Sequence, residues 1–445
     1  MFRRILIANR GEIALRIIRA CREMNVEVVC VFSQDDRGAS YLDLADEAIC
    51  IGGPAPKDSY LKSDRIIAAA EVTGADAIHP GYGFLAENAR FAEQCRDGTI
   101  EFIGPSAASM RRLGDKASAR ELAKKAKVPT VPGSDGIVDN ADSAVELADQ
   151  VGFPVMLKAS AGGGGRGMRI AYDKTDLQAA FRQAAEEAKG AFNNPALYIE
   201  KFIERPRHVE VQVIADHHGH IVHLAERDCT LQRRYQKLVE ESPSPAIDAR
   251  TRRDLCSAAV RICKHADYNS TGTVEFLVDT KGKFYFIEVN TRIQVEHPVT
   301  EMTTGIDLIK EQIRVAAGEP LSFNQRSVKP RDHVIECRIN AEDPAEKFRP
   351  CAGTLAIFRP PGGPGVRVDT HAHDGYRVSP SYDSLLAKVI VRQPTRLDAI
   401  RCMQRCLAEF VIEPLKTTAP FLERVFSHPD FTAGHIDTGF VERTF

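Results

Sequence analysis

The sequence lacks a long apolar run that could serve as a signal peptide or cross a membrane. Its start, MFRRILIANRGEIA, has two arginines, a short apolar stretch and then charged residues. A signal peptide needs a longer apolar core, and a spanning helix needs about 20 apolar residues. We therefore expect a cytoplasmic protein that does not contact a membrane.

An excess of charge of either sign is also missing. The 445 residues include 59 lysines and arginines against 61 aspartates and glutamates. The overall field therefore favours neither nucleic acid nor an anionic membrane, and any anionic substrate must be held by local charge. The chain is too long for one comfortable hydrophobic core and predicts a protein of about two to four packed units.

The cysteines do not form the paired motifs of a metal or redox site. There are eleven, an odd number, and none is arranged as C-x-x-C. Cys30, Cys50 and Cys337 lie inside apolar, strand-like runs, where a thiol behaves as a small hydrophobic group. We interpret them as reduced core residues.

Two common nucleotide-binding motifs are absent as well. The first strand and turn, IANRGEIA at 7–14, resemble a dinucleotide fold but lack the G-x-G-x-x-G that lets the backbone approach a pyrophosphate. NAD is therefore not the expected ligand. The glycine-rich run KASAGGGGRGM at 158–168 does not end in G-K-[ST], so it is not a Walker A loop.

The chain divides into three predicted units. Strand-like and helical stretches alternate over the first hundred residues, at 4–8, 12–24, 27–32 and 63–73, which predicts a parallel sheet with crossover helices. A Pro- and Gly-rich stretch at 128–136 marks entry into a smaller lid. The predicted units are 1–113, 114–330 with a lid at about 131–203, and a strand-rich 331–445.

A predicted hairpin brings two carboxylates together. The runs TVEFLVD at 273–279 and FYFIEVN at 284–290 flank a two-residue turn at 281–282, which places Glu275 opposite Glu288. The other face would hold Val274, Phe276, Val278, Tyr285, Ile287 and Val289 in the core. Opposed carboxylates are destabilising unless a cation lies between them. With Asn290 on the same face, the set suits Mg²⁺ or Mn²⁺; the alternative is a solvated face with two incidental glutamates.

The run at 158–168 suits phosphate binding. Lys158 ends an apolar strand, and the glycines that follow expose backbone N–H groups at close range. A loop that closes over ATP needs such freedom. A flexible surface loop is the alternative.

A third cluster follows directly, in NTRIQVEHPVTE from residue 290. An extended chain would turn Arg292, Gln294 and Glu296 to one side. Arginine binds planar oxyanions, and the carboxylate could remove a proton, which fits bicarbonate. The alternative is a surface ion pair between Arg292 and Glu296.

Together these motifs resemble the biotin carboxylase family of the ATP-grasp superfamily, and within it the subunits of bacterial acetyl-CoA carboxylase. The matching strings cover nearly the whole chain: IANRGEIA at 7–14, HPGYGFLAEN at 79–88, GDK at 114–116, KASAGGGGRGM at 158–168, RHVEVQV at 207–213, AERDCTLQRR at 225–234, FIEVNTRIQVEHPVTE at 286–301 and ECRINAEDP at 336–344. The resemblance implies a mixed α/β and α+β fold of three domains. These are an N-terminal parallel α/β domain, a central ATP-grasp domain with a mobile lid, and a strand-rich C-terminal domain.

The resemblance also implies roles for matching residues. Those at the nucleotide and its metal would be Lys116, Lys158, Gly164, Gly165, Glu200, Lys201, Phe202, Ile203, His208, Gln232, Glu275, Glu288 and Asn290. Bicarbonate would lie among Lys237, Arg292, Gln294 and the backbone of Val295, with Glu296 as general base. At biotin, Arg338 would stabilise the enolate-like oxygen and Tyr82 would lie near the ring.

Three positions depart from the family pattern. Tyr235 stands where a histidine beside the nucleotide is usual, Ala161 where a further glycine is common, and Pro364 where a large apolar residue helps a dimer contact. These departures leave the implied reaction intact. They leave the affinity for ATP and the strength of the dimer open.

The implied activity is carboxylation of carrier-bound biotin with MgATP and bicarbonate, through carboxyphosphate. The sequence has no Ala-Met-Lys-Met biotinylation motif, so we expect the biotin carrier and a carboxyltransferase on other chains, with a homodimer of this one. The final carboxyl acceptor stays open among acetyl-CoA, propionyl-CoA, pyruvate and other acceptors. Other interpretations are a different ATP-grasp ligase, such as a carbamoyl-phosphate synthetase unit, and a catalytically idle nucleotide-binding or scaffold subunit. The joint presence of Arg292, Gln294, Glu296 and Arg338 argues against both.

Overall fold

The N-terminal part of the chain is a parallel sheet with helices packed against it, as the sequence predicted. The computed structural model describes residues 1–160, 168–192 and 194–445. The strand order is β3-β2-β1-β4-β5, with bounds Glu47–Gly52, Glu27–Ser33, Arg4–Ile7, Ala77–His79 and Glu101–Phe102. Its helices are α1 (Gly11–Glu23), α2 (Ser63–Thr73), α3 (Ala89–Asp97) and α4 (Ala107–Gly114).

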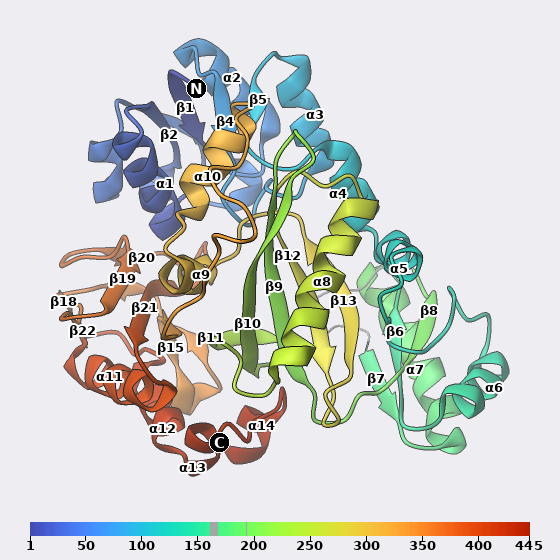
Figure 1. The fold of residues 1–445 in the computed structure, drawn as a ribbon. Coiled ribbons are helices and arrows are strands. Elements are labelled where there is room, and N and C mark those ends of the chain that lie inside the picture. Colours follow the sequence, from blue (N-terminus) through green and yellow to red (C-terminus); the bar gives the residue numbers. More distant parts are fainter. Residues whose placement is uncertain (161–167, 193) are drawn as a thin grey trace.

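A small three-stranded antiparallel sheet projects to one side of the molecule (Figure 1). Its order is β7-β6-β8, with bounds Met168–Ala171, Val155–Ala159 and Leu197–Lys201. Helices α6 (Ala141–Val151) and α7 (Lys174–Phe192) cover it, and alanines and leucines of these elements form a core of their own. Helix α5 (Lys116–Lys125) connects this part to α4.

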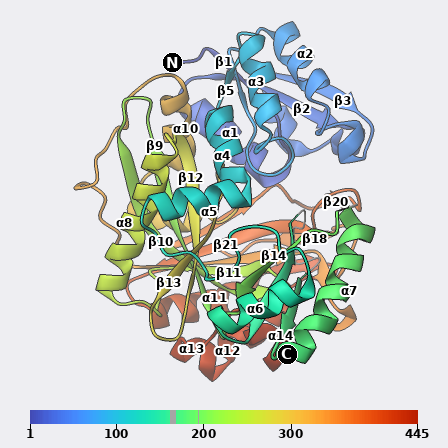
Figure 2. The same ribbon diagram turned by 90° about the vertical axis from the view of Figure 1, so that its right-hand side faces the viewer.

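An eight-stranded antiparallel sheet occupies the middle of the molecule and extends into the C-terminal part (Figure 2). Its order is β13-β12-β9-β10-β11-β14-β21-β19, with bounds Phe284–Asn290, Ser270–Val278, Arg207–Ala215, Ile221–Arg233, Gln236–Ser242, His333–Asn340, Leu385–Gln393 and Val366–Thr370. Helix α8 (Ala249–His265) packs on strands β9 and β10, and α11 (Arg396–Glu409) packs on β14 and β21.

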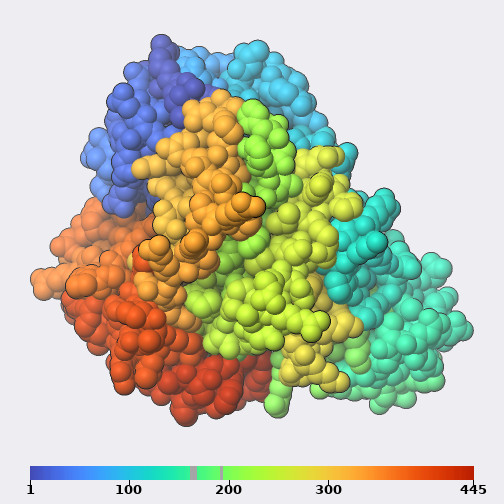
Figure 3. All heavy atoms as spheres, viewed as in Figure 1, coloured from blue at the N-terminus to red at the C-terminus, as the bar shows by residue number. Residues whose placement is uncertain are grey.

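Shorter elements complete the C-terminal part. The strands are β15 (Glu342–Asp343), β16 (Arg349–Pro350), β17 (Gly353–Thr354), β18 (Ile357–Arg359), β20 (Arg377–Val378) and β22 (Val411–Glu413), and the helices are α12 (Ala419–Ser427), α13 (Pro429–Ala433) and α14 (Phe440–Thr444). Helices α9 (His297–Thr304) and α10 (Leu308–Ala316) precede them. In Figure 3 the orange segment that carries α10 lies between the blue N-terminal part and the green strands.

Cys50 departs from the prediction for the cysteines. Cys30 and Cys337 are buried, but Cys50 is exposed because it lies on β3, the edge strand of the parallel sheet. All eleven thiols are free. None of the helices in the described part of the chain is long and apolar enough to cross a membrane.

The β12–β13 hairpin places Glu275 directly opposite Glu288, as predicted. The turn differs, because the ladder ends at Asp279 and Lys283 and leaves residues 280–282 in the loop. A bulge at Ile287 of β13, opposite the step from Glu275 to Phe276, compensates for the longer loop and restores the predicted register at the carboxylates.

The bulge corrects the predicted core face of β13. Phe276 pairs with Phe286, and Phe284 pairs with Val278, so these aromatic rings pack into the core. The prediction that Tyr285 and Ile287 lie on this face was wrong, since a shift of one residue moves a strand's side chains to the opposite face.

Candidate active site

Buried polar side chains gather on one face of the eight-stranded sheet, across strands β9 to β13. In β9, Val209, Val211 and Val213 pack into the core, so strand alternation turns Glu210 and Gln212 to the opposite face. Both polar side chains are fully buried. A buried carboxylate requires a cationic partner, and the neighbouring strands supply two.

Arg227 of β10 is the first of these cations and lies at the centre of the polar face. It is fully buried and donates at 2.7 Å to both Glu210 and the side-chain oxygen of Gln212. Its other hydrogen bonds go to Thr273, Thr300 and Gln294. Burial favours the neutral guanidinium, but Glu210 outweighs it and raises the pKa of Arg227. Sequence reasoning assigned no role to Arg227 or Glu210, although the alternation of polar residues with valines at 209–213 was a signal for the latter.

Lys237 of β11 is the second cation and contacts three carboxylates. Its Nζ lies 2.6 Å from Glu210, 3.0 Å from Glu275 and 2.7 Å from Glu296. Burial opposes its charge, yet these carboxylates raise the pKa of Lys237 well above its usual value. Lys237 is therefore a fixed cation that joins the carboxylate pair of the hairpin to Glu296.

Glu296 lies between two cations at the end of this network. One of its oxygens accepts from Lys237, and the other accepts from Arg338 of β14 at 2.7 Å. Burial would raise the pKa of Glu296, but Lys237 and Arg338 hold that pKa well below its usual range. The side chain is thus an ionised, buried carboxylate, available to accept a proton.

Arg292 does not pair with Glu296, which removes the predicted alternative of a surface ion pair. Its guanidinium contacts Glu87 at 2.9 Å and the side-chain oxygen of Asn290 at 3.0 Å. The extended conformation on which the predicted arrangement of Arg292, Gln294 and Glu296 depended does not occur: residues 291–296 form no strand, and α9 begins at His297. Gln294 nevertheless faces the site, donating to Glu275 at 3.1 Å.

The opposed carboxylates of the hairpin fit a divalent cation. Burial and the charge of Glu275 raise the pKa of Glu288. Burial opposes the charge of Glu275, but Lys237 and His208 outweigh it and lower the pKa of that carboxyl well below its usual range. Asn290 donates to Glu275 at 2.8 Å, and His208 lies 3.1 Å from its other oxygen. A cation between the two carboxylates would relieve their repulsion, and oxygen ligands suit Mg²⁺ or Mn²⁺.

A second cluster surrounds Glu200 at the end of β8. This buried carboxylate pairs with Lys158 at 2.5 Å and with Arg120 of α5, which sequence reasoning missed. Lys116 is exposed at the start of α5, and its charge acts on Glu288. Lys201 directs its amine to the carbonyls of Gly152 and Phe153, and the partly exposed Phe202 and Ile203 follow it. Gly164, Gly165 and Ala161 lie outside the described residues.

Three further residues were singled out from the sequence. Gln232 is buried and pairs in register with Lys237. Tyr82 donates its hydroxyl hydrogen to Glu12 of α1. Tyr235 is 61% exposed at the tip of the β10–β11 hairpin, with a left-handed φ of 66°.

Comparison with known proteins identifies the family of the chain. The profile for the biotin carboxylase N-terminal domain matches residues 1–110, and that for its C-terminal domain matches 336–443. Between them, residues 115–324 match the ATP-binding domain of the carbamoyl-phosphate synthase L chain. The chain belongs to the biotin carboxylase family.

Relatives of known name agree over the full length. The chain is 54% identical over 441 residues to the biotin carboxylase of Nostoc sp., covering 99% of both chains. It is also 50% identical over 442 residues to a pyruvate carboxylase subunit of Methanothermobacter thermautotrophicus, covering 99% of this chain and 90% of that one.

Solved structures give the same result. The biotin carboxylase of Campylobacter jejuni, in a nucleotide complex, has a TM-score of 0.95 at 47% identity and covers 100% of this chain and 99% of that one. The biotin carboxylase domain dimer of Hydrogenobacter thermophilus 2-oxoglutarate carboxylase, with MgADP and bicarbonate, has a TM-score of 0.94 at 48% identity and covers 100% and 98%.

Family membership confirms the three-part ATP-grasp fold and a ligase that binds ATP. The polar face thus belongs to a biotin carboxylase. Because relatives carry the names of carboxylases for different acceptors, membership alone leaves the final acceptor open.

Proposed function

We propose that this biotin carboxylase uses MgATP and bicarbonate to carboxylate biotin on a separate carrier protein. The observation that carries the proposal is the position of Glu296, whose two oxygens contact Lys237 and Arg338. The opposed pair Glu275 and Glu288 lies on the other side of Lys237. A site for a small planar anion therefore adjoins a site for a phosphate-bound cation.

The metal would be held by Glu275 and Glu288, with Asn290 beside them. When bound, Mg²⁺ or Mn²⁺ supplies charge neutralisation at the transferring phosphoryl group. Lys116 and Lys158 would contact the phosphates. Lys158 lies 2.5 Å from Glu200, so a phosphate oxygen would compete with this carboxylate for the amine.

Bicarbonate would bind through Lys237, Arg292, Gln294 and the backbone of Val295. The carboxylate of Glu296 accepts hydrogen bonds from Lys237 and Arg338. An entering anion would take over part of these bonds, which raises the pKa of Glu296 and makes it a stronger base. Bicarbonate, losing its proton to Glu296, would attack the γ-phosphate and form carboxyphosphate and ADP.

The second stage concerns biotin. Carboxyphosphate would break down to CO₂ and phosphate, the phosphate would take the N1′ proton of biotin, and the resulting nucleophile would capture CO₂. Arg338 would stabilise the oxygen on which negative charge develops, and Tyr82 would lie beside the ring. We propose that the lid, at about 131–203, closes to exclude water, because water destroys carboxyphosphate.

The finer assignment is to acetyl-CoA carboxylase, and so to fatty acid biosynthesis. It rests on the resemblance of the sequence motifs to the subunits of bacterial acetyl-CoA carboxylase, and relatives of Nostoc and of Bacillus subtilis at 54% identity carry the name biotin carboxylase. A carboxylase for pyruvate is the second candidate, favoured by the Methanothermobacter relative, which carries the name of pyruvate carboxylase. A carrier protein, a carboxyltransferase, a cytoplasmic setting and a homodimer belong to the same proposal, and a related domain is described as a dimer.

The proposal is tested by measuring MgATP hydrolysis with and without bicarbonate and free biotin. Hydrolysis should require bicarbonate and rise with biotin, since the carboxyphosphate route couples all three. Equal rates in the presence and absence of bicarbonate would contradict it. Identifying the chains that co-purify with this one would decide the final acceptor.

A further inference from the structure

Lys388 is a buried cation that contacts the main chain of the candidate bicarbonate site. It lies on β21, is 0% exposed, and donates from Nζ to the carbonyl oxygen of Val295 at 2.9 Å. Val295 lies between Gln294 and Glu296, whose side chains both face the site. Fixing this carbonyl therefore restricts the orientation of both neighbours.

Carboxylates from two other elements fix the position of the amine. Glu12 of α1 lies 3.0 Å from Nζ, and Asp369 of β19 lies 4.0 Å from it. Both carboxylates are buried; Lys388 compensates Glu12 away from solvent, and Arg367 compensates Asp369. Glu12 also accepts from Tyr82, which links the amine to the candidate biotin residue.

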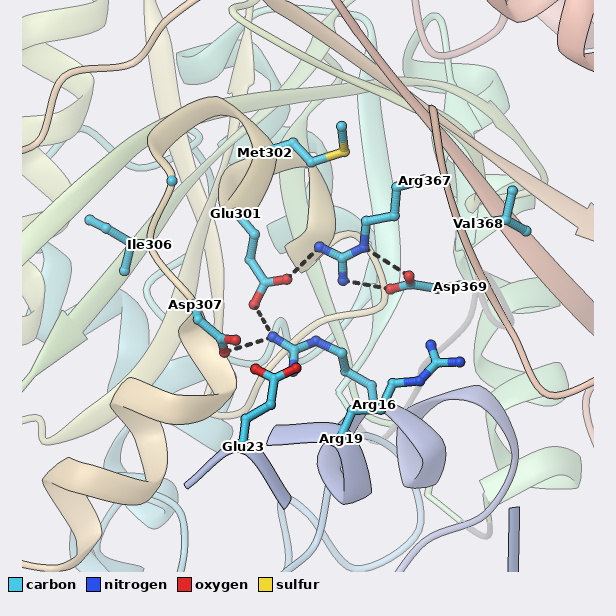
Figure 4. Close-up of a pocket in the computed structure, with 11 residues that line it drawn as sticks. Arg16, Arg19, Glu23, Glu301, Met302, Ile306, Asp307, Arg367, Val368 and Asp369 are labelled. Atoms are coloured by element: carbon cyan, nitrogen blue, oxygen red, sulfur yellow. Dashed lines mark hydrogen bonds and ion pairs between the residues drawn. The ribbon is translucent and has the colours of Figure 1, made fainter. Parts of the chain in front are cut away.

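A chain of ion pairs links Asp369 to α9, the helix that follows the candidate bicarbonate site in the sequence. Arg367 contacts Asp369 at 2.7 Å and Glu301 at 2.8 Å, and Arg16 contacts Glu301 at 2.9 Å. These side chains line a cavity of about 400 Å³, and Figure 4 shows Arg16, Arg367 and the carboxylates pointing toward one another. Glu301 lies on α9, so the segment from Val295 to Glu301 is held at both ends, by Lys388 and by the two arginines.

We infer that Lys388 is a positioning residue that sets the Val295 backbone, and through it Gln294 and Glu296, for bicarbonate. The inference rests on the proposed function, because the role of Val295 is part of that proposal. Lys388 touches no reacting atom in this arrangement; it acts through the main chain.

The kinetic test uses a variant that keeps the buried charges balanced. Lys388→Met alone would leave Glu12 as an unpaired buried carboxylate, so it would test folding more than positioning. The double variant E12Q/K388M removes one cation and one anion, keeps an acceptor for Tyr82, and leaves Asp369 with Arg367. The single variant Glu12→Gln is the matched control, because it retains the hydrogen bond from Lys388 to Val295.

We expect E12Q/K388M to raise the KM for bicarbonate about tenfold, while the KM for ATP stays within about twofold. Glu12→Gln should change the KM for bicarbonate less than about threefold. Lys388→Arg keeps the charge but cannot place a nitrogen at the same point, so it should raise the KM for bicarbonate by about threefold. If the double variant does not fold, this single variant tests the role of Lys388.

The outcomes separate this inference from the proposed function. A wild-type chain whose ATP hydrolysis ignores bicarbonate would overturn the proposed function. If the wild type needs bicarbonate, a folded E12Q/K388M with an unchanged KM for bicarbonate, or with equal rises for bicarbonate and ATP, would overturn the role of Lys388. An unchanged KM for bicarbonate in Lys388→Arg would do the same where the double variant is unfolded. Thermal melts beside each assay establish folding.

Discussion

Glu240 and Glu336 lie directly opposite each other on the adjacent strands β11 and β14, and both are fully buried. Arg338 donates to Glu240 at 2.7 Å, whereas neither oxygen of Glu336 has a hydrogen-bond partner in the described part of the chain. Burial raises the pKa of Glu240 to about 7 and that of Glu336 well above its usual value. Two buried carboxyl groups therefore hold protons beside Arg338 under conditions in which the unfolded chain has lost them.

This pair predicts a stability that falls as pH rises. A carboxyl whose folded pKa is raised binds its proton more tightly in the native state, so stability declines above the unfolded pKa of about 4.5 until the folded pKa is passed. Glu336→Gln removes the contribution of Glu336 and leaves that of Glu240. We expect the variant to melt a few degrees higher than wild type at pH 8, with a smaller difference at pH 5. Calorimetry at both pH values checks this, and a difference that is larger at pH 5 would contradict it.

Glu288→Gln should lower turnover by orders of magnitude with little loss of folding. The substitution keeps the shape of the side chain and removes charge from the opposed carboxylate pair that would hold the metal. ATP hydrolysis and a circular dichroism melt are measured on the same preparation. Glu71→Gln, at an exposed position on α2, is the control and should behave as wild type. Near-normal turnover of Glu288→Gln would show that Glu288 is not a metal ligand.

Tyr235→His should lower the KM for ATP several-fold and leave kcat within about twofold. Tyrosine places its hydroxyl farther from the backbone than a histidine nitrogen, and a neutral hydrogen bond contributes about 0.5–1.5 kcal/mol. Histidine also tolerates the left-handed φ of this hairpin tip better than tyrosine does. Steady-state kinetics decide the point. An unchanged or raised KM for ATP would mean that tyrosine already serves in this role.

The proposed homodimer should be of modest strength. Pro364 is exposed in the loop between β18 and β19, and a proline buries less apolar area than a large aromatic ring. We expect Pro364→Phe to strengthen dimerisation in sedimentation experiments, with activity per protomer unchanged. Finding only monomer for the wild type at tens of micromolar would reject the dimer.

The sequence predicted those parts of the site that depend on local register. Glu275 and Glu288 follow from strand alternation and a hairpin, which is information confined to residues 273–290. The bulge at Ile287 keeps Glu275 opposite Glu288 but changes which residues of β13 pack into the core. The sequence did not predict the bulge, because a bulge depends on how the strand packs. Pro298 in the first turn of α9 was an available signal against an extended 291–296, since proline favours helix starts.

Other parts of the site could not be read from the sequence. Lys388 meets Glu12 across 376 residues of sequence, and Arg227 gathers partners from four other segments. Long-range pairings of this kind have no local pattern. The same holds for the contact of Arg120 with Glu200, which joins α5 to β8. The resemblance named the residues that we propose for the reaction, while the buried charges that contact them became visible only in the fold.

The pairing of β11 with β14 ties the two sides of the predicted boundary at residue 330 to each other. This ladder, from Val239–Cys337 to Ser242–Val334, crosses the predicted boundary at residue 330 and makes one continuous sheet of its two sides. Separate expression of 1–330 and 331–445 would leave β11 and β14 as uncovered edge strands, the kind of surface on which chains aggregate. The two fragments should therefore be recovered in soluble form when produced together and precipitate when produced apart, so that a split of this enzyme would be an obligate complementation pair.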